Sequence, residues 1–333
     1  MRDILDAYRV LAASGPVGRA VVTRVWGSAP RTEGATIVAT ADGRMAGSVS
    51  GGCVEAAVVL EIQEAIRTGT SKLVSYAVSD EKAWEVGLSC GGTIDVLVEP
   101  TVRPEIVAAA ESRYSTVVAS VLSGAAPGAP GGELSAVLAG EGALRAATTE
   151  CRRMDVTLPT GPVTVFLEAF PQPPKLVVVG AVHLAEVLVT LAVELGYRTI
   201  VTDGREALLT RERFPTADEL VVGWPEETLA QIGLDRDTAV CILTHDPKFD
   251  EPALRVALRS AAGYVGAIGS RKTQAARRVR LSNEGFSEQE IARLHGPIGL
   301  DLGGRSPAEV ALAILAEVTA VRHGRGGRAV ASA

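Results

Sequence analysis

The second half of the chain alternates short apolar runs with amphipathic stretches. The apolar runs cover residues 175–180, 198–203, 219–223, 238–246 and 264–269. Helical periodicity covers 183–196, 225–233 and 251–261, and further helices are expected from Lys272 and Ser306. Buried strands that alternate with helices at this spacing are typical of a Rossmann-like, doubly wound parallel sheet.

The first half also mixes strand and helix patterns. Strand-like segments cover 19–27, 35–47 with a turn at Asp42-Gly43, 72–78, 93–100, 115–124 and 162–170. Residues 1–15 and 55–66 have helical periodicity, the second ending at Gly69, and 124–133 is a Gly/Ala/Pro-rich loop. This pattern predicts an N-terminal α/β domain.

Two prolines of "PQPP" (171–174) are adjacent and favour a stiff, extended connector between the halves. We therefore expect two domains, at residues 1–170 and 175–325. The alternative is that 171–174 is a surface loop inside a single domain.

The charge balance of 33 basic against 39 acidic residues argues against a nucleic-acid-binding surface. The first 15 residues contain acids and resemble an amphipathic helix more than a signal peptide. The most apolar window, 175–196, is interrupted by Gly180 and contains Glu186 and Glu194, so no membrane span is expected. Four widely separated cysteines do not form a secreted disulfide pattern. We expect a cytoplasmic protein.

The first strand–helix turn of the second half partly matches the dinucleotide-binding pattern G-x-G-x-x-G/A. Gly180 and Ala185 occupy the first and last small positions, whereas Val182 replaces the glycine that lets a pyrophosphate approach. Asp203 follows where an acid could hold a ribose hydroxyl. An NAD(P) site is possible, although Val182 counts against it. The alternative is a Rossmann scaffold with another ligand or none.

Polar residues follow several of the predicted strands. His183 begins a helix, where it could bind phosphate, transfer a proton or simply be solvated. His245 and Asp246 follow one strand, and Ser270 and Arg271 follow another. Because ligands bind at the carboxyl ends of parallel strands, we expect these residues to converge with Asp203. Ordinary helix capping could also explain each of them.

Several longer segments resemble the XdhC/CoxI family, the accessory proteins of xanthine dehydrogenase and related molybdenum hydroxylases. The matching segments are "GSAPRTEGATIVATADGRMAGSVSGGCVE", "SCGGTIDVLVEP", "THDPKFDEPAL", "YVGAIGSRKT" and "HGPIGLDLGGRSPAEVALAILAEV". The resemblance implies a chaperone that binds the molybdenum cofactor, protects it during sulfuration and delivers it to an apo-hydroxylase. A cysteine desulfurase is the other implied partner. The family's turn G-x-G-H-x-A is matched except at Val182.

The resemblance also implies roles for two glycine-cysteine motifs. The backbone of Ser50, Gly51 and Gly52, with Glu55 beside it, suits the phosphate of a molybdopterin-type cofactor. Cys53 or Cys90, the latter followed by Gly91 and Gly92, could contact molybdenum or hold sulfur. Cys53 lies near a helix start, where its thiolate would be favoured, but it could also be a small residue in a tight turn.

The other two cysteines are interpreted differently. Cys241 lies in an apolar strand and is expected in the core, and Cys151 is assigned no role. No ligand spacing typical of zinc sites occurs, so no resident metal site is predicted.

The sequence is compatible with three functions. The first is a cofactor-insertion chaperone that is not itself a turnover enzyme. The second is an NAD(P)-dependent oxidoreductase that uses a cysteine as redox partner, and the third is a docking scaffold without bound cofactor. A homodimer is the default assembly.

Overall fold

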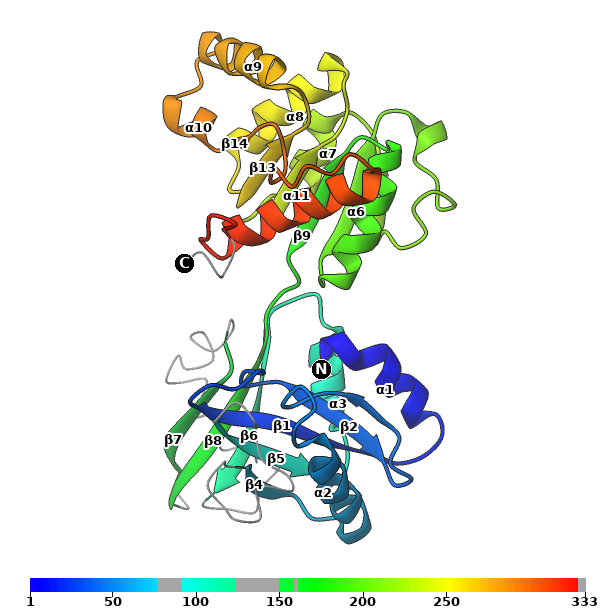
Figure 1. Cartoon of the computed structure of the whole chain (residues 1–333), viewed down its shortest axis with the longest axis vertical. Coiled ribbons are helices and arrows are strands. Elements are labelled where there is room, and N and C mark those ends of the chain that lie inside the picture. Colours follow the sequence, from blue (N-terminus) through cyan, green and yellow to red (C-terminus); the bar gives the residue numbers. More distant parts are fainter. Residues whose placement is uncertain (77–91, 124–149, 159–160, 329–333) are drawn as a thin grey trace. The chain divides into compact units, whose positions relative to one another are not determined.

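A computed structural model of the chain describes residues 1–76, 92–123, 150–158 and 161–328. The chain divides into two compact units, Met1–Gln172 and Pro173–Ala333, which we call unit 1 and unit 2. Both units contain helices and strands (Figure 1).

Unit 1 contains two antiparallel sheets. The five-stranded sheet has the order β3-β2-β1-β5-β4, and the three-stranded sheet has the order β6-β8-β7. The strands are β1 (Val17–Trp26), β2 (Thr36–Thr40), β3 (Met45–Gly47), β4 (Lys72–Tyr76), β5 (Thr93–Glu99), β6 (Thr116–Ser123), β7 (Arg152–Leu158) and β8 (Gly161–Phe170). The helices are η1 (Arg2–Ile4), α1 (Leu5–Ala12), α2 (Glu55–Thr68) and α3 (Pro104–Glu111).

Successive side chains of β1 point to opposite faces of the sheet and enter two different buried clusters. Ala20 and Val22 belong to a buried cluster with α2, on one face of the five-stranded sheet. Val21 belongs to a second cluster with Leu97 of β5 and Phe166 of β8. The three-stranded sheet therefore packs on the opposite face of β1 from α2.

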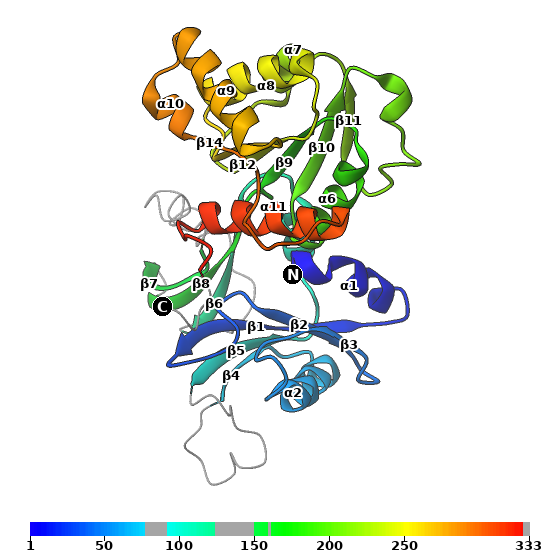
Figure 2. The ribbon, with the colours of Figure 1, turned by 45° about the horizontal axis from the view of Figure 1, so that its top comes forward.

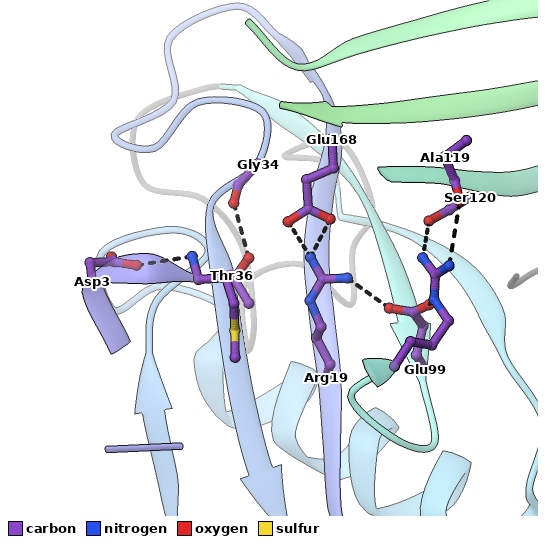
Figure 3. A network of polar contacts seen from close by, with 10 residues as sticks. Asp3, Arg19, Gly34, Thr36, Glu99, Ala119, Ser120 and Glu168 are labelled. Atoms are coloured by element: carbon purple, nitrogen blue, oxygen red, sulfur yellow. Dashed lines mark hydrogen bonds and ion pairs between the residues drawn. The ribbon is translucent and has the colours of Figure 1, made fainter. Parts of the chain in front are cut away.

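A buried ion cluster links the two sheets of unit 1 (Figure 3). Arg19 of β1 is fully buried; its Nη1 donates to Glu99 Oε2 at 2.8 Å and its Nη2 to both carboxylate oxygens of Glu168 on β8. Arg103 Nε donates to the other Glu99 oxygen at 2.9 Å, and Arg103 Nη2 bonds Ser120 of β6. Two cations and two anions thus neutralise each other between the sheets.

Unit 2 is a Rossmann-like domain with a six-stranded parallel sheet of order β11-β10-β9-β12-β13-β14. The strands are β9 (Lys175–Val179), β10 (Arg198–Asp203), β11 (Glu219–Val222), β12 (Thr238–Ile242), β13 (Tyr264–Ala267) and β14 (Leu294–His295). The helices are α6 (His183–Glu194), η3 (Glu206–Leu208), α7 (Pro225–Ile232), α8 (Pro247–Arg259), α9 (Arg271–Asn283), α10 (Glu288–Ala292) and α11 (Pro307–Arg322). In strand order this is 3-2-1-4-5-6, the doubly wound topology of dinucleotide-binding folds.

Helices cover both faces of the unit 2 sheet. One buried cluster joins the sheet to α6 and α11, and the other joins it to α7 and α8 (Figure 2). Local signals set the helix starts: Ser306 and Glu309 form a capping box at α11, as Ser287 and Glu290 do at α10. The predicted α/β class and doubly wound sheet are confirmed.

Some elements differ from the sequence-based expectation. Helix α8 begins at Pro247, four residues before the predicted start, because Asp246 caps it and proline fits the first helical turn. Helix α3 and strand β7 were not predicted. The predicted loop 124–133 lies outside the described residues. Among the described helices, none combines the length and the apolar character that a bilayer crossing requires.

We expect Arg19→Met to destabilise unit 1 by about 3–5 kcal/mol, because two buried carboxylates lose their cation. In a Trp224→Phe background the remaining tryptophans, Trp26 and Trp84, both belong to unit 1, so their fluorescence reports its urea unfolding. As a control, Arg67→Ala removes an exposed arginine paired with Glu64 and should leave the midpoint nearly unchanged. Equal midpoints for Arg19→Met and the parent would show that the cluster does not stabilise unit 1.

Candidate functional site

The loop that carries Cys53 is folded around the carboxylate of Glu55, the first residue of α2. Glu55 is only 7% exposed. Both of its carboxylate oxygens accept hydrogen bonds from backbone N–H groups of the loop. Oε1 receives the N–H groups of Val49 (3.2 Å), Ser50 (2.9 Å) and Gly51 (3.1 Å), and Oε2 receives those of Gly52 (2.8 Å) and Val54 (3.2 Å). The Ser48 and Ser50 hydroxyls also donate to it, at 2.7 and 2.6 Å.

This arrangement keeps the Glu55 carboxylate ionised. Burial by itself would raise the pKa of Glu55, but the hydrogen bonds from Ser50, Ser48 and the backbone outweigh it and lower the pKa to about 2. The N–H groups of Ser50, Gly51 and Gly52, which we expected to be open to a phosphate, are donated to this internal carboxylate instead. Glu55 therefore positions the loop.

Cys53 is half-buried on this loop, two residues before α2 begins. Its N–H donates to Ser50 Oγ at 3.0 Å, and its side chain packs against the apolar cluster under α2. The backbone on both sides of the thiol is thus fixed, through Ser50 and through Glu55.

The segment between β1 and β2 contacts both glycine motifs. A Cβ placed on Gly51 would lie 3.6 Å from the Pro30 Cβ, and one placed on Gly92 would lie 2.5 Å from the Ser28 carbonyl oxygen. Ser28 and Pro30 are two residues apart, so both motifs flank one short segment. Cys90 and Gly91 lie outside the described residues. We call residues 27–35 the bridging loop.

A cavity of about 780 Å³ adjoins the bridging loop. Its lining residues are Pro30, Arg31, Thr32, Glu33, Gly34, Ala35, Glu150, Cys151 and Ala169. The volume falls in the range of small-molecule sites, which is roughly 300–1,000 Å³. Because Pro30 lines the cavity and also contacts Gly51, the cavity and the Cys53 loop share a wall.

Cys151 is the thiol at this cavity, and the sequence analysis assigned it no role. It lies just before β7 and packs so closely on Gly34 that a Cβ there would be 2.6 Å from the sulfur. Burial raises the pKa of the Cys151 thiol to about 11, so at neutral pH it is the uncharged thiol. The signal that could have indicated this wall is the motif "APRTEGA", which contains most of the lining residues.

In unit 2, the turn after β9 depends on Gly180. Its φ is +109°, and a Cβ there would lie 2.3 Å from Thr244 Cγ2, so only glycine fits. Val182 has ordinary extended dihedrals (φ −89°, ψ 165°) and packs against the core beneath α6. The departure at Val182 therefore leaves the turn unstrained. His183 is exposed at the start of α6, with Nδ1 3.5 Å from the Glu186 carboxylate.

Asp203 is saturated by partners within the protein. Its Oδ2 accepts the Ala181 N–H at 2.7 Å and Arg205 Nη2 at 2.8 Å, and its Oδ1 accepts Arg205 Nε at 2.9 Å. The carboxylate is fully buried. In this arrangement Asp203 anchors the glycine turn and holds Arg205, rather than offering free oxygens to a ribose.

The remaining predicted residues of unit 2 lie at the ends of β12 and β13. His245 and Ser270 line one cavity of about 250 Å³ together with Arg277 and Thr273. Asp246 caps α8 through the Lys248 N–H at 3.0 Å, and Ser270 caps α9 through the Thr273 N–H at 3.1 Å.

The residues that were expected to converge therefore meet only in part, since His245 and Ser270 line one cavity together. Arg271 is exposed at the start of α9, and neither it nor Asp246 lines the cavity that His245 and Ser270 share. Cys241 is fully buried in β12, as predicted. No group of three His, Cys, Asp or Glu side chains within the described ranges is arranged to hold a metal ion.

Replacing Glu55 should free the loop amides. Glu55→Gln turns one acceptor oxygen into an NH₂ group facing N–H donors, and a hydrogen bond to a charged group is worth about 1.5–3 kcal/mol. Amide hydrogen exchange in residues 49–54 should accelerate at least about tenfold. Glu64→Gln, on the exposed face of the same helix, is the matched control. Unchanged protection in Glu55→Gln would contradict the positioning role.

The raised pKa of Cys151 predicts a slow, pH-dependent reaction with iodoacetamide. Because only the thiolate attacks, at pH 7.5 its alkylation should be about a hundredfold slower than in the urea-unfolded chain. The folded-state rate should rise about tenfold per pH unit as the pH approaches 11. Peptide mass spectrometry resolves Cys151 from the other thiols. Equal rates in the folded and unfolded chains would contradict the buried environment.

Comparisons with known proteins are consistent across the chain. The family model "XdhC Rossmann domain" matches residues 176–318, and the model "XdhC and CoxI family" matches residues 10–77. The chain is 26% identical over 324 residues to a protein of Bacillus subtilis named as a probable xanthine dehydrogenase subunit, covering 91% of this chain and 92% of the relative.

Two further matches extend over most of both proteins. The chain is 28% identical over 323 residues to the "Molybdenum cofactor insertion chaperone PaoD" of Escherichia coli, covering 95% of this chain and 87% of PaoD. A crystal structure described as a xanthine dehydrogenase from Bacillus halodurans superposes with a TM-score of 0.75 at 25% identity, covering 100% of this chain and 98% of that one. The resemblance inferred from the sequence motifs is confirmed, and the chain belongs to the XdhC and CoxI family.

Proposed function

We propose that this protein is a molybdenum-cofactor insertion chaperone for a xanthine dehydrogenase-like molybdenum hydroxylase. The observation that carries the proposal is the cavity of about 780 Å³ in unit 1, whose bridging-loop wall also supports the Cys53 loop. The relative PaoD is itself named as a molybdenum cofactor insertion chaperone. The cofactor would occupy the cavity, with Cys53 at its edge.

The residues of unit 1 fit a molybdopterin-type cofactor in two respects. The cavity is large enough for a pterin, and Arg31 in its wall, whose Nη2 lies 3.6 Å from Asp3 Oδ2, would be the cation nearest to a bound phosphate. Cys53 offers a thiol, which as a thiolate is a soft ligand suited to molybdenum or to sulfur under exchange. When bound, the cofactor supplies the metal centre that the hydroxylase requires.

In a third respect the fit differs from the sequence-based expectation. The glycine loop donates its N–H groups to Glu55, so the phosphate would be held by the cavity wall rather than by Ser50, Gly51 and Gly52. Glu55 keeps its place in the site as the residue that orients Cys53. The proposal includes Cys90 because Gly92, two residues further along the chain, contacts Ser28 of the bridging loop.

The proposed partners are the apo-hydroxylase and a cysteine desulfurase, and the proposed setting is a cytoplasmic homodimer. An NAD(P)-dependent oxidoreductase is less well supported, because Asp203 has no free oxygen for a ribose hydroxyl. A docking scaffold without cofactor differs from the chaperone in one measurable property, namely cofactor content.

The test is the cofactor content of the full chain, isolated anaerobically from cells that synthesise molybdenum cofactor. Metal analysis and the fluorescence of the oxidised pterin should give close to one molybdenum and one pterin per chain. Cys53→Ala should lose most of both. Cys241→Ala, which removes a thiol from the core of unit 2, is the matched control and should retain them.

Two outcomes would contradict the proposal. The wild-type chain could contain neither molybdenum nor pterin while still activating apo-hydroxylase, which would identify a docking scaffold. Alternatively, Cys53→Ala could retain the full cofactor content, which would remove Cys53 from the site.

A further inference from the structure

The amino ends of β12 and β13 border a small cavity of unit 2 that none of the sites above includes. It has a volume of about 180 Å³. The first residues of both strands line it, together with Tyr197 before β10 and with Val318, Val321 and Arg322 near the end of α11. Rossmann-like folds bind nucleotides at the carboxyl ends of the strands, which is the opposite edge of the sheet. This cavity is therefore separate from the nucleotide crevice.

The inner wall of the cavity is largely apolar. The rings of Tyr197 and Tyr264 are buried, at 6% and 4% exposure. The Tyr264 hydroxyl donates to Glu317 Oε2 at 2.6 Å. The Thr238 hydroxyl donates to Asp235 Oδ1 at 2.7 Å. Because both protons are used inside the protein, this wall offers a ligand mainly carbon surface.

Two arginines supply the charge of the lining. Arg236 and Arg322 are exposed residues, and within the described part of the chain neither forms an ion pair with a carboxylate. The Arg322 guanidinium carbon lies 5.8 Å from the Tyr197 ring centroid, so its charge lies beside the apolar wall. Asp237 is the acid among the lining residues. The lining therefore has one surplus positive charge at neutral pH.

The backbone that carries Arg236 is fixed against the sheet. A Cβ on Gly263 would lie 2.1 Å from the Arg236 carbonyl oxygen, so glycine permits this close approach. The Gly263 N–H donates to the Thr238 carbonyl at 3.0 Å. On the other side, the Asp237 carbonyl accepts the Lys175 N–H at 2.9 Å. The loop needs no rearrangement to present its cation, which lowers the entropic cost of binding.

Two negative groups near the cavity are satisfied within the protein. The carboxyl end of a helix carries a partial negative charge, but at α11 the carbonyls of residues 319–321 accept N–H groups from residues 323–325. Glu317 does not line the cavity, and its Oε2 accepts both the Tyr264 hydroxyl and the Gly299 N–H. The arginines therefore determine the sign of the charge that a ligand meets.

We infer that this cavity binds a small carboxylate that carries one aromatic ring. The ring would pack on the apolar wall, and the carboxylate would accept hydrogen bonds from Arg236 and Arg322. An apolar cavity of about 150 Å³ holds one benzene ring, so the volume suits a single ring. The surplus positive charge suits one carboxylate. This inference concerns neither a nucleotide nor the molybdenum cofactor, and it does not rest on the proposed chaperone function.

The test is a fluorine NMR titration of the full chain with para-fluorobenzoate, which has both the ring and the charge. Para-fluorobenzamide has nearly the same shape without the charge, and it should bind at least about tenfold more weakly, because hydrogen bonds to charged groups are the stronger ones. Acetate has the charge without the ring, and it should compete at least about tenfold more weakly, because it buries little apolar surface.

Two variants remove one cation each. Arg236→Gln and Arg322→Gln should each weaken the binding of para-fluorobenzoate by at least about tenfold. Lys272→Gln is the matched control, because it removes an exposed cation of unit 2 that does not line the cavity, and it should leave the affinity unchanged. All three side chains are exposed, so circular dichroism should show each variant folded.

Three results would overturn the inference. The first is absence of binding at millimolar para-fluorobenzoate. The second is an affinity for para-fluorobenzamide or acetate equal to that for para-fluorobenzoate. The third is wild-type affinity in either folded arginine variant, or an equal loss in Lys272→Gln.

Discussion

The arrangement of unit 1 depends on the buried pairing of Arg19 with Glu99 and Glu168. Each of these groups would be costly to bury alone, and an arginine between two sheets is tolerated only when both carboxylates are in place. The pairing therefore favours one relative position of β1, β5 and β8. Ala169, the neighbour of Glu168, lines the large cavity, and the bridging loop continues from the end of β1. The shape of the cavity thus follows from an interaction in the interior that itself contacts no ligand.

The fold of unit 2 could be predicted because its strands are buried on both faces. Such strands appear as continuous apolar runs, and the helices between them keep a clear period. Unit 1 was harder to predict, since its antiparallel strands mix polar and apolar residues. A charged residue such as Arg19 in that pattern suggests a solvated face, although it is fully buried in the structure. Only the pairing of strands distant in sequence explains its position.

The candidate sites could be predicted only in part, and the reason is similar. The glycine motif before α2 correctly indicated a backbone arranged for an anion, but sequence spacing could not show that Glu55, within the motif, is that anion. Asp203 was identified at the correct strand end, whereas its partners, the Ala181 N–H and Arg205, depend on the turn geometry. Cys151 gave no sequence signal, because its position follows from the packing of β7 against the bridging loop. The XdhC/CoxI motifs, by contrast, correctly indicated the family.

The carboxylate of Glu55 also determines how the Cys53 loop behaves over time. A loop that becomes ordered only when its ligand arrives loses conformational entropy on binding, and this ordering costs part of the interaction energy. Here the ordering is completed during folding, with the protein's own side chain in the place of the anion. A ligand that reaches the Cys53 thiol therefore meets a loop that is already folded, and its binding requires no ordering of this backbone.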